Sequence, residues 1–144
     1  MLRRTPCVGI CSTTYGDLVC RGCKRFSHEI VQWNGFADDQ RRLVWQRLHE
    51  LREGAVLSCL RIDDEVLLRA EAELLGVPML GSLSVANIAY EVLRRSRNEI
   101  ELSLLGLSPL AGDQAASELY RHIERELFER SVAHYERNFH VSAR

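Results

Sequence analysis

Cys7-Val8-Gly9-Ile10-Cys11 and Cys20-Arg21-Gly22-Cys23 decide the fold of the first part of this chain. They hold four cysteines in two close pairs, and eight residues separate the pairs. Two short loops that fold back can point four sulfurs at one tetrahedral centre, so the spacing predicts one metal site with Cys7, Cys11, Cys20 and Cys23 as ligands. A metal ion whose coordination shell is filled by four thiolates has a structural or electron-transfer role. Such a site does not by itself identify a reaction.

Four cysteine ligands are compatible with either Zn²⁺ or an iron–sulfur cluster. Zinc binds four thiolates in small loop-rich modules and supplies much of their folding free energy, and a short glycine-rich loop favours this redox-inert ion. Clusters use the same ligands, but the spacing lacks the run of three cysteines typical of bacterial ferredoxins. Cys20 and Cys23 alone could form a redox dithiol, although such pairs normally open a helix after a strand, which the glycine-rich sequence before Cys20 does not offer.

The amino-acid composition limits the classes of protein to which this chain can belong. The chain has 144 residues, of which 46% are hydrophobic, enough for a buried core, and its net charge is −1. Residues 1–53 carry nine Lys and Arg against six Asp and Glu, an excess too small for nonspecific binding to a phosphate backbone. No apolar run resembles a signal peptide or a membrane span, so we expect a cytoplasmic protein without a membrane partner. The reducing cytoplasm favours metal ligation over disulfides, and Cys59 is expected to be a small buried residue.

Periodicity and capping residues predict a mainly α fold, in which a small four-cysteine metal knuckle packs on a helical body with one or two short strands. Ser27 and Asp38 are the expected N-caps of the first two helices, and Trp33, Phe36 and Trp45 are expected to pack against the knuckle. A strand is predicted for 55–62, although periodicity there does not exclude a buried helix. The predicted helices cover 27–33, 38–54, 63–75, a stretch from Ser84 to around Gly106, and 113–139. We expect a cysteine-rich domain over 1–53 and a helical region over 54–144.

No catalytic constellation is evident, so catalysis is not expected. Glu118 and His122 lie one turn apart on the last predicted helix, as do Glu136 and His140, but di-iron sites need further glutamates and a second such helix. A phosphate-binding glycine loop and a serine nucleophile motif are also missing from the sequence.

The segment around the cysteines resembles a known bacterial family. The matching residues are Thr5-Pro6-Cys7, Cys11, Cys20-Arg-Gly-Cys23-Lys-Arg25, Glu29-Ile30-x-x-Trp33 and Arg41-Arg42-x-Val44-Trp45-x-x-Leu48. They resemble the domain of unknown function numbered 1289, whose members are commonly labelled iron–sulfur proteins, over about residues 5–52. The resemblance implies that the four cysteines are metal ligands, and it marks Arg25, Glu29 and Trp33 as signature positions of unstated role. It implies no reaction.

These observations predict a metal-binding interaction or regulatory protein without catalysis of its own. The alternative is an iron–sulfur electron carrier or redox sensor. The expected partner is another protein, with RNA or DNA as the less supported choice. The candidate interaction surface combines the basic residues near the knuckle with two signature residues: Arg21, Lys24, Arg25, Glu29, Trp33, Arg41 and Arg42.

Overall fold

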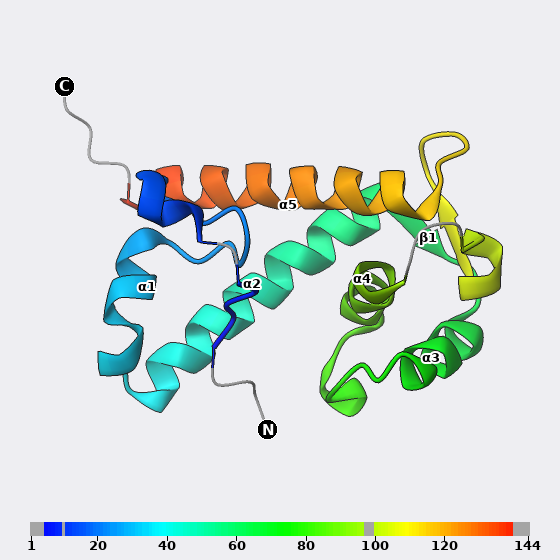
Figure 1. The fold of residues 1–144 in the computed structure, drawn as a ribbon, viewed down its shortest axis with the longest axis horizontal. Coiled ribbons are helices and arrows are strands. Elements are labelled where there is room, and N and C mark those ends of the chain that lie inside the picture. The colour runs from blue at the N-terminus through cyan, green and yellow to red at the C-terminus, as the bar shows by residue number, and fades with distance from the viewer. Residues whose placement is uncertain (1–4, 10, 97–99, 140–144) are drawn as a thin grey trace. The chain divides into compact units, whose positions relative to one another are not determined.

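The computed structural model describes residues 5–9, 11–96 and 100–139. Within these ranges the chain forms five α-helices and two short strands (Figure 1), so the predicted mainly α class is confirmed. The helices are α1 (Ser27–Gln32), α2 (Asp38–Cys59), α3 (Glu65–Leu74), α4 (Val85–Arg95) and α5 (Ala116–Phe139), and the strands are β1 (Leu60–Ile62) and β2 (Leu107–Pro109).

The chain divides into two compact units, which are treated separately below. The cysteine unit comprises 5–51 and 128–139 of the described residues, and the helical unit comprises 52–127. The end of α5, from Phe128 to Phe139, is grouped with the cysteine unit.

In the cysteine unit, α1 begins one residue earlier than the sequence predicted, because Ser27 was expected to be its N-cap. Phe26 is the N-cap, and its extended backbone pairs with Val19 in an isolated antiparallel bridge. Ser27 is already helical, and its N–H donates to the Leu18 carbonyl at 2.8 Å. The ring of Phe26 is fully buried, which fixes the residue where the helix starts. Burial of an aromatic ring therefore overrides the usual preference for serine at the cap.

An aromatic cluster forms the core between α1 and α2 within this unit. Trp33 and Phe36 lie edge to face, with ring centroids 6.2 Å apart. Trp33 and Trp45 are buried core residues, and Phe36 is half-buried against them. The buried members of the cluster are Trp33, Val44, Trp45 and Leu48.

The predicted strand over 55–62 is largely wrong. α2 continues through Gly54 to Cys59, and only Leu60–Ile62 are extended. Ala55, Val56 and Cys59 are all buried, and this spacing matches one face of a helix as well as it matches a short buried strand. A glycine inside a helix costs about 1 kcal/mol relative to alanine, and packing of the residues around it outweighs that cost.

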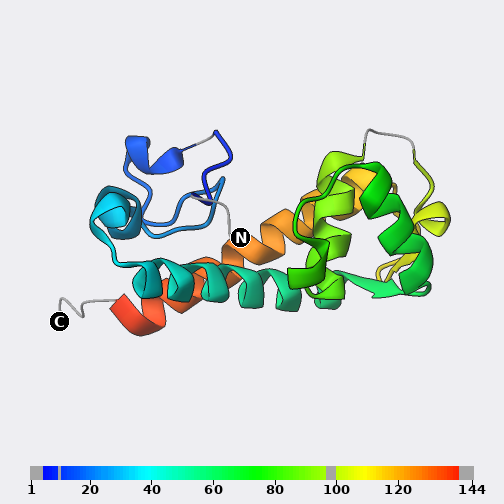
Figure 2. The ribbon, with the colours of Figure 1, turned by 90° about the horizontal axis from the view of Figure 1, so that it is seen from below.

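In the helical unit, α3 and α4 pack side by side (Figure 2). The Asp64 side chain caps α3 by accepting the Leu67 N–H, and Ser84, the predicted start of the next helix, caps α4 by accepting the Asn87 N–H. β1 and β2 pair antiparallel, with Arg61 opposite Ser108.

α4 is shorter than the helix predicted from Ser84 to around Gly106. It ends at Arg95, where both the N–H and the hydroxyl of Ser96 donate to the Val92 carbonyl. Ile100 lies beyond its end, and Leu102–Leu105 form a separate 3₁₀ turn. Residues 97–99 lie outside the described residues. The apolar positions after Arg95 serve the turn and β2 instead, because Leu105 and Leu107 are both buried there.

Candidate metal centre

The second cysteine pair forms a tight turn whose backbone closes on itself. The Cys20 N–H donates to the Arg25 carbonyl, and the Lys24 N–H donates to the Cys20 carbonyl, each at 2.9 Å. Lys24 adopts φ = 66°, a left-handed conformation that is uncommon for a residue with a side chain. The turn buries both Cys20 and Cys23 and holds their side chains next to each other, since each thiol contributes to the electrostatics of the other.

Backbone N–H groups converge on the sulfur of Cys20. Burial raises the pKa of this thiol, but the N–H groups of Cys23, Ser12 and Gly22 outweigh it and hold the pKa below its ordinary value. At Cys23, burial has the larger effect and raises the pKa of the thiol, against the opposing influence of Arg25. Cys20 is therefore the sulfur of this pair that the fold prepares for the thiolate form, which is the form that ligates metals.

The first cysteine pair lies on a more open segment. Cys7 is exposed, and its sulfur accepts the Gly9 N–H at 3.4 Å. Cys11 is half-buried, and its sulfur lies 2.9 Å from the Thr13 hydroxyl oxygen.

Ser12 connects the two cysteine segments. Its N–H is one of the donors to the Cys20 sulfur, and its hydroxyl oxygen accepts the Arg21 N–H at 2.8 Å. The backbone directly after Cys11 is thus fixed beside the second pair.

The structure brings together Cys20 and Cys23, and in the described part of the chain no third ligand lies with them. Over 5–9, 11–96 and 100–139, no three side chains of His, Cys, Asp or Glu gather closely enough to hold a metal ion. The donors present are thiols with N–H groups pointing at sulfur, a chemistry that suits zinc or an iron–sulfur cluster. Cys59 is buried elsewhere, on the last turn of α2.

The three signature positions are interior residues. Arg25 is 4% exposed, Glu29 5% and Trp33 6%, and neighbouring Lys24 is 3% exposed. The Arg25 Nε–H donates to the Cys23 sulfur at 3.3 Å, and its guanidinium carbon lies 5.0 Å from the centre of the Trp33 ring. Their side chains therefore stabilise the turn from inside instead of facing a partner.

The candidate interaction surface is correspondingly smaller than the sequence suggested. Arg21 is two-thirds exposed, and its guanidinium covers the Phe128 ring within the same unit. Arg42 is exposed, whereas Arg41 is partly covered and donates to the Trp33 carbonyl at 3.0 Å. Among the seven residues proposed, only these three arginines present charge to solvent.

Arg47 is the partner that sequence reasoning missed. Its guanidinium binds the Glu29 carboxylate and lies 4.0 Å from the centre of the Phe26 ring. The available signal was its place on α2 between Val44 and Leu48, a helix face that the aromatic core buries. A long cation on that face needs an acidic partner, and Glu29 is the buried acid in this unit.

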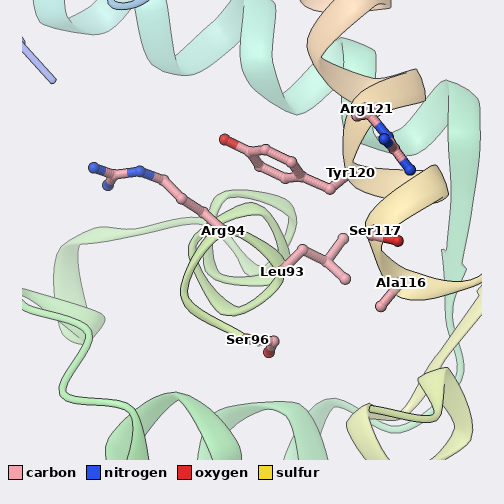
Figure 3. Close-up of a pocket in the computed structure, with 7 residues that line it drawn as sticks. All are labelled: Leu93, Arg94, Ser96, Ala116, Ser117, Tyr120 and Arg121. Carbon is pink, nitrogen blue, oxygen red and sulfur yellow. The ribbon is translucent and has the colours of Figure 1, made fainter. Parts of the chain in front are cut away.

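A cavity in the helical unit is another feature that could hold a ligand. It measures about 240 Å³ and lies between α4 and the first turns of α5. Figure 3 shows Leu93 pointing toward α5, while the Arg94 side chain extends away from the other lining residues. Arg94 is paired with Glu91 at 3.1 Å. The lining contains no carboxylate, thiol or imidazole, so it offers no acid–base pair or nucleophile of the usual kinds.

These features define a mainly α protein with a cysteine-rich N-terminal segment. A family model described as "Protein of unknown function (DUF1289)" matches residues 5–52, so the resemblance is confirmed over that segment, about a third of the chain. None of the curated proteins and none of the solved structures matches the chain. The described helices include none with both the length and the apolar character needed to span a bilayer.

Proposed function

We propose that the N-terminal segment binds one metal ion or cluster through Cys7, Cys11, Cys20 and Cys23, and that the protein is a non-catalytic interaction or regulatory protein. The observation that carries this proposal is the set of N–H groups directed at sulfur. Gly9 donates to Cys7, and three backbone donors act on Cys20. Such donors stabilise thiolates and are a common outer shell of metal–sulfur sites.

The two pairs share a local pattern that supports a joint role. In each pair, the residue two positions after the first cysteine is a glycine whose N–H acts on that cysteine's sulfur, Gly9 for Cys7 and Gly22 for Cys20. Ser12 anchors the first segment beside the second. Only the open segment with Cys7 and Cys11 has to adjust for four sulfurs to meet, and Gly9, at φ = 91°, has the conformational freedom for this.

The ligand set also supports a role without catalysis. Four thiolates fill the coordination sphere of a tetrahedral ion and leave no position for water or substrate. The bound metal would instead supply folding free energy to a loop-rich segment. We place the protein in the cytoplasm, where thiols stay reduced, and infer that its partner is another protein, reached through Arg21, Arg41 and Arg42. Nucleic acid is the weaker choice because these three cations do not form a basic face.

Metal analysis of protein purified without oxygen tests the site. We expect one Zn²⁺ or one cluster per chain, lost when Cys20 or Cys7 is replaced by serine. Cys59→Ser is the matched control, because Cys59 is buried outside the cysteine unit and should leave the metal content unchanged. Full metal content in Cys7→Ser would refute the four-thiolate site.

An iron–sulfur electron carrier or redox sensor is the second candidate. The burial of Cys20 and Cys23 favours it, because shielding from water and hydrogen bonds to sulfur are the means by which proteins tune cluster potentials. Bound sulfide and a broad visible absorption band in the anaerobic protein would support this candidate. Colourless protein with one zinc per chain would reject it.

A further inference from the structure

Arg25 is a buried cation, and among the described residues the Cys23 sulfur is the neighbour that can carry negative charge beside it. Its side chain is 4% exposed, and its contacts are the Cys23 sulfur and the face of Trp33. Within the described residues, no carboxylate lies within ion-pair distance of its guanidinium. Burying a charge without a partner of opposite sign is very costly, so a buried arginine indicates a compensating negative charge.

The nearby acid does not provide that charge. Glu29 is buried in the same unit, but both of its carboxylate oxygens bind Arg47, at 2.5 and 2.7 Å, and Oε1 also accepts the Phe26 N–H. Its charge is already matched by one guanidinium.

We propose that Arg25 is a positioning residue that compensates the negative charge of a metal–thiolate centre at Cys23 and its fellow ligands. The inference rests on the proposed function and specifies the charge of the centre that the site accepts. Four thiolates around a divalent ion leave a net charge of about −2, and the Arg25 guanidinium beside the Cys23 sulfur offsets part of it. The Nε–H donor also fixes the direction of the Cys23 sulfur, and Trp33 holds the guanidinium plane in place.

This role predicts effects of opposite sign in the two states of the protein. With metal bound, Arg25 lies beside an anion, and removing its charge weakens the complex. Without metal, the positive charge of Arg25 lacks most of the negative charge that compensates it. Removing the Arg25 charge should therefore not destabilise the metal-free protein. An arginine that served only to pack against Trp33 would stabilise both states alike.

The test compares Arg25→Gln, Arg25→Lys and Arg21→Gln. Arg21 lies between Cys20 and Cys23 in the sequence, but it is exposed and its guanidinium lies over Phe128, so Arg21→Gln makes the same charge change away from sulfur. Affinity for Co²⁺ and Zn²⁺ is measured by competition with a chromophoric chelator, and the visible spectrum of bound Co²⁺ reports the thiolate count. Urea unfolding of metal-free and metal-loaded protein gives the stability of each state.

We expect Arg25→Gln to weaken Zn²⁺ binding at least about tenfold, in the range of other residues that contact metal ligands. Arg25→Lys should recover part of that loss, and Arg21→Gln should change affinity by less than about threefold. Metal-free Arg25→Gln should be as stable as the metal-free wild type or more stable.

Two results would overturn the inference while leaving the proposed function standing. One is equal metal affinity in Arg25→Gln and Arg21→Gln. The other is an equal loss in Arg25→Lys and Arg25→Gln together with lower stability of both metal-free variants, which would assign Arg25 a packing role. If the wild type showed no Co²⁺–thiolate spectrum at all, this result would refute the proposed metal site itself. The role of Arg25 would then be refuted as well, because it depends on that site.

Discussion

Arg47 binds Glu29 at two points, with Nη1 2.5 Å from Oε2 and Nη2 2.7 Å from Oε1. The two residues are 18 positions apart, on α2 and α1. Both side chains are largely buried, and the Arg47 guanidinium covers the Phe26 ring. This ion pair joins the start of α1, directly after the cysteine turn, to the helix that holds the aromatic core.

Replacing Glu29 by glutamine should lower the free energy of unfolding by about 3 kcal/mol, because Arg47 is left as a buried cation without its anion. Urea denaturation measures the change. Glu65→Gln is the control, since the Glu65–Arg69 pair is exposed and should contribute less than about 1 kcal/mol. A loss in Glu29→Gln no larger than in this control would show that the buried pair does not stabilise the fold.

Acidification should destabilise the cysteine unit through His134. Burial lowers the pKa of its imidazole, Arg47 and Arg137 lower it further, and Glu29 opposes them. Because the unfolded chain then binds the proton more readily, stability is full above the ordinary pKa of about 6.5 and is lost as pH falls through that range.

Unfolding midpoints between pH 7.5 and 5.5 test this expectation for His134. The wild type should lose stability across this interval, and His134→Gln should lose less. An identical pH dependence in the two proteins would contradict the assignment.

Gly106→Ala should be strongly destabilising, by more than about 2 kcal/mol. Gly106 has φ = 73°, and a Cβ there would lie 2.4 Å from the Asp64 carbonyl oxygen. Gly76→Ala is the matched control: its φ is 72°, but a Cβ there meets no atom within 4 Å, so we expect a cost of about 1 kcal/mol. Equal losses in the two variants, measured by thermal unfolding, would rule out the close approach to Asp64.

Tyr90 should stay un-ionised in the folded protein well into the alkaline range. Burial raises the pKa of its phenol well above 10, with Arg52 opposing and Glu124, which accepts its hydroxyl, raising it further. The folded pKa exceeds the unfolded one, so this contribution to stability is full below about pH 10 and is lost as pH rises beyond it.

Phenolate absorbance during an alkaline titration checks the behaviour of Tyr90. Its ionisation should coincide with unfolding, and Tyr90→Phe should unfold with a weaker dependence on alkaline pH. Ionisation of all four tyrosines of the wild type before any loss of helical circular dichroism would contradict it.

Much of the helical fold was predictable from local signals. Ser84 was identified as an N-cap, the acidic residues at 63–65 marked the start of α3, and Gly76, with positive φ, follows the end of that helix. Caps and glycines act within one turn, so the residues alone reveal them. Predictions from the residues were wrong where a short apolar run fits helix and strand equally, as at 55–59, and where such a run continues past a helix end, as it does after Arg95.

For the candidate site, the sequence supplied the cysteines and the signature positions but not their surroundings. Lys24, Arg25 and Glu29 suggested a solvated charged patch, and the structure buries all three. Burial of a charge depends on a partner that is distant in sequence, as Arg47 is for Glu29. Sequence spacing gives no sign of that partner, because α1 and α2 have to fold before the two side chains meet.

The order of the residues alone determined the helical class, the paired thiols and the match over 5–52, because periodicity and spacing are local properties. Tertiary structure alone decided that Phe26 starts α1, that Glu29 neutralises Arg47, and that Arg25 faces sulfur. These depend on which groups lose their water together, and the free energy of a buried charge is set by neighbours that only the folded chain brings within reach.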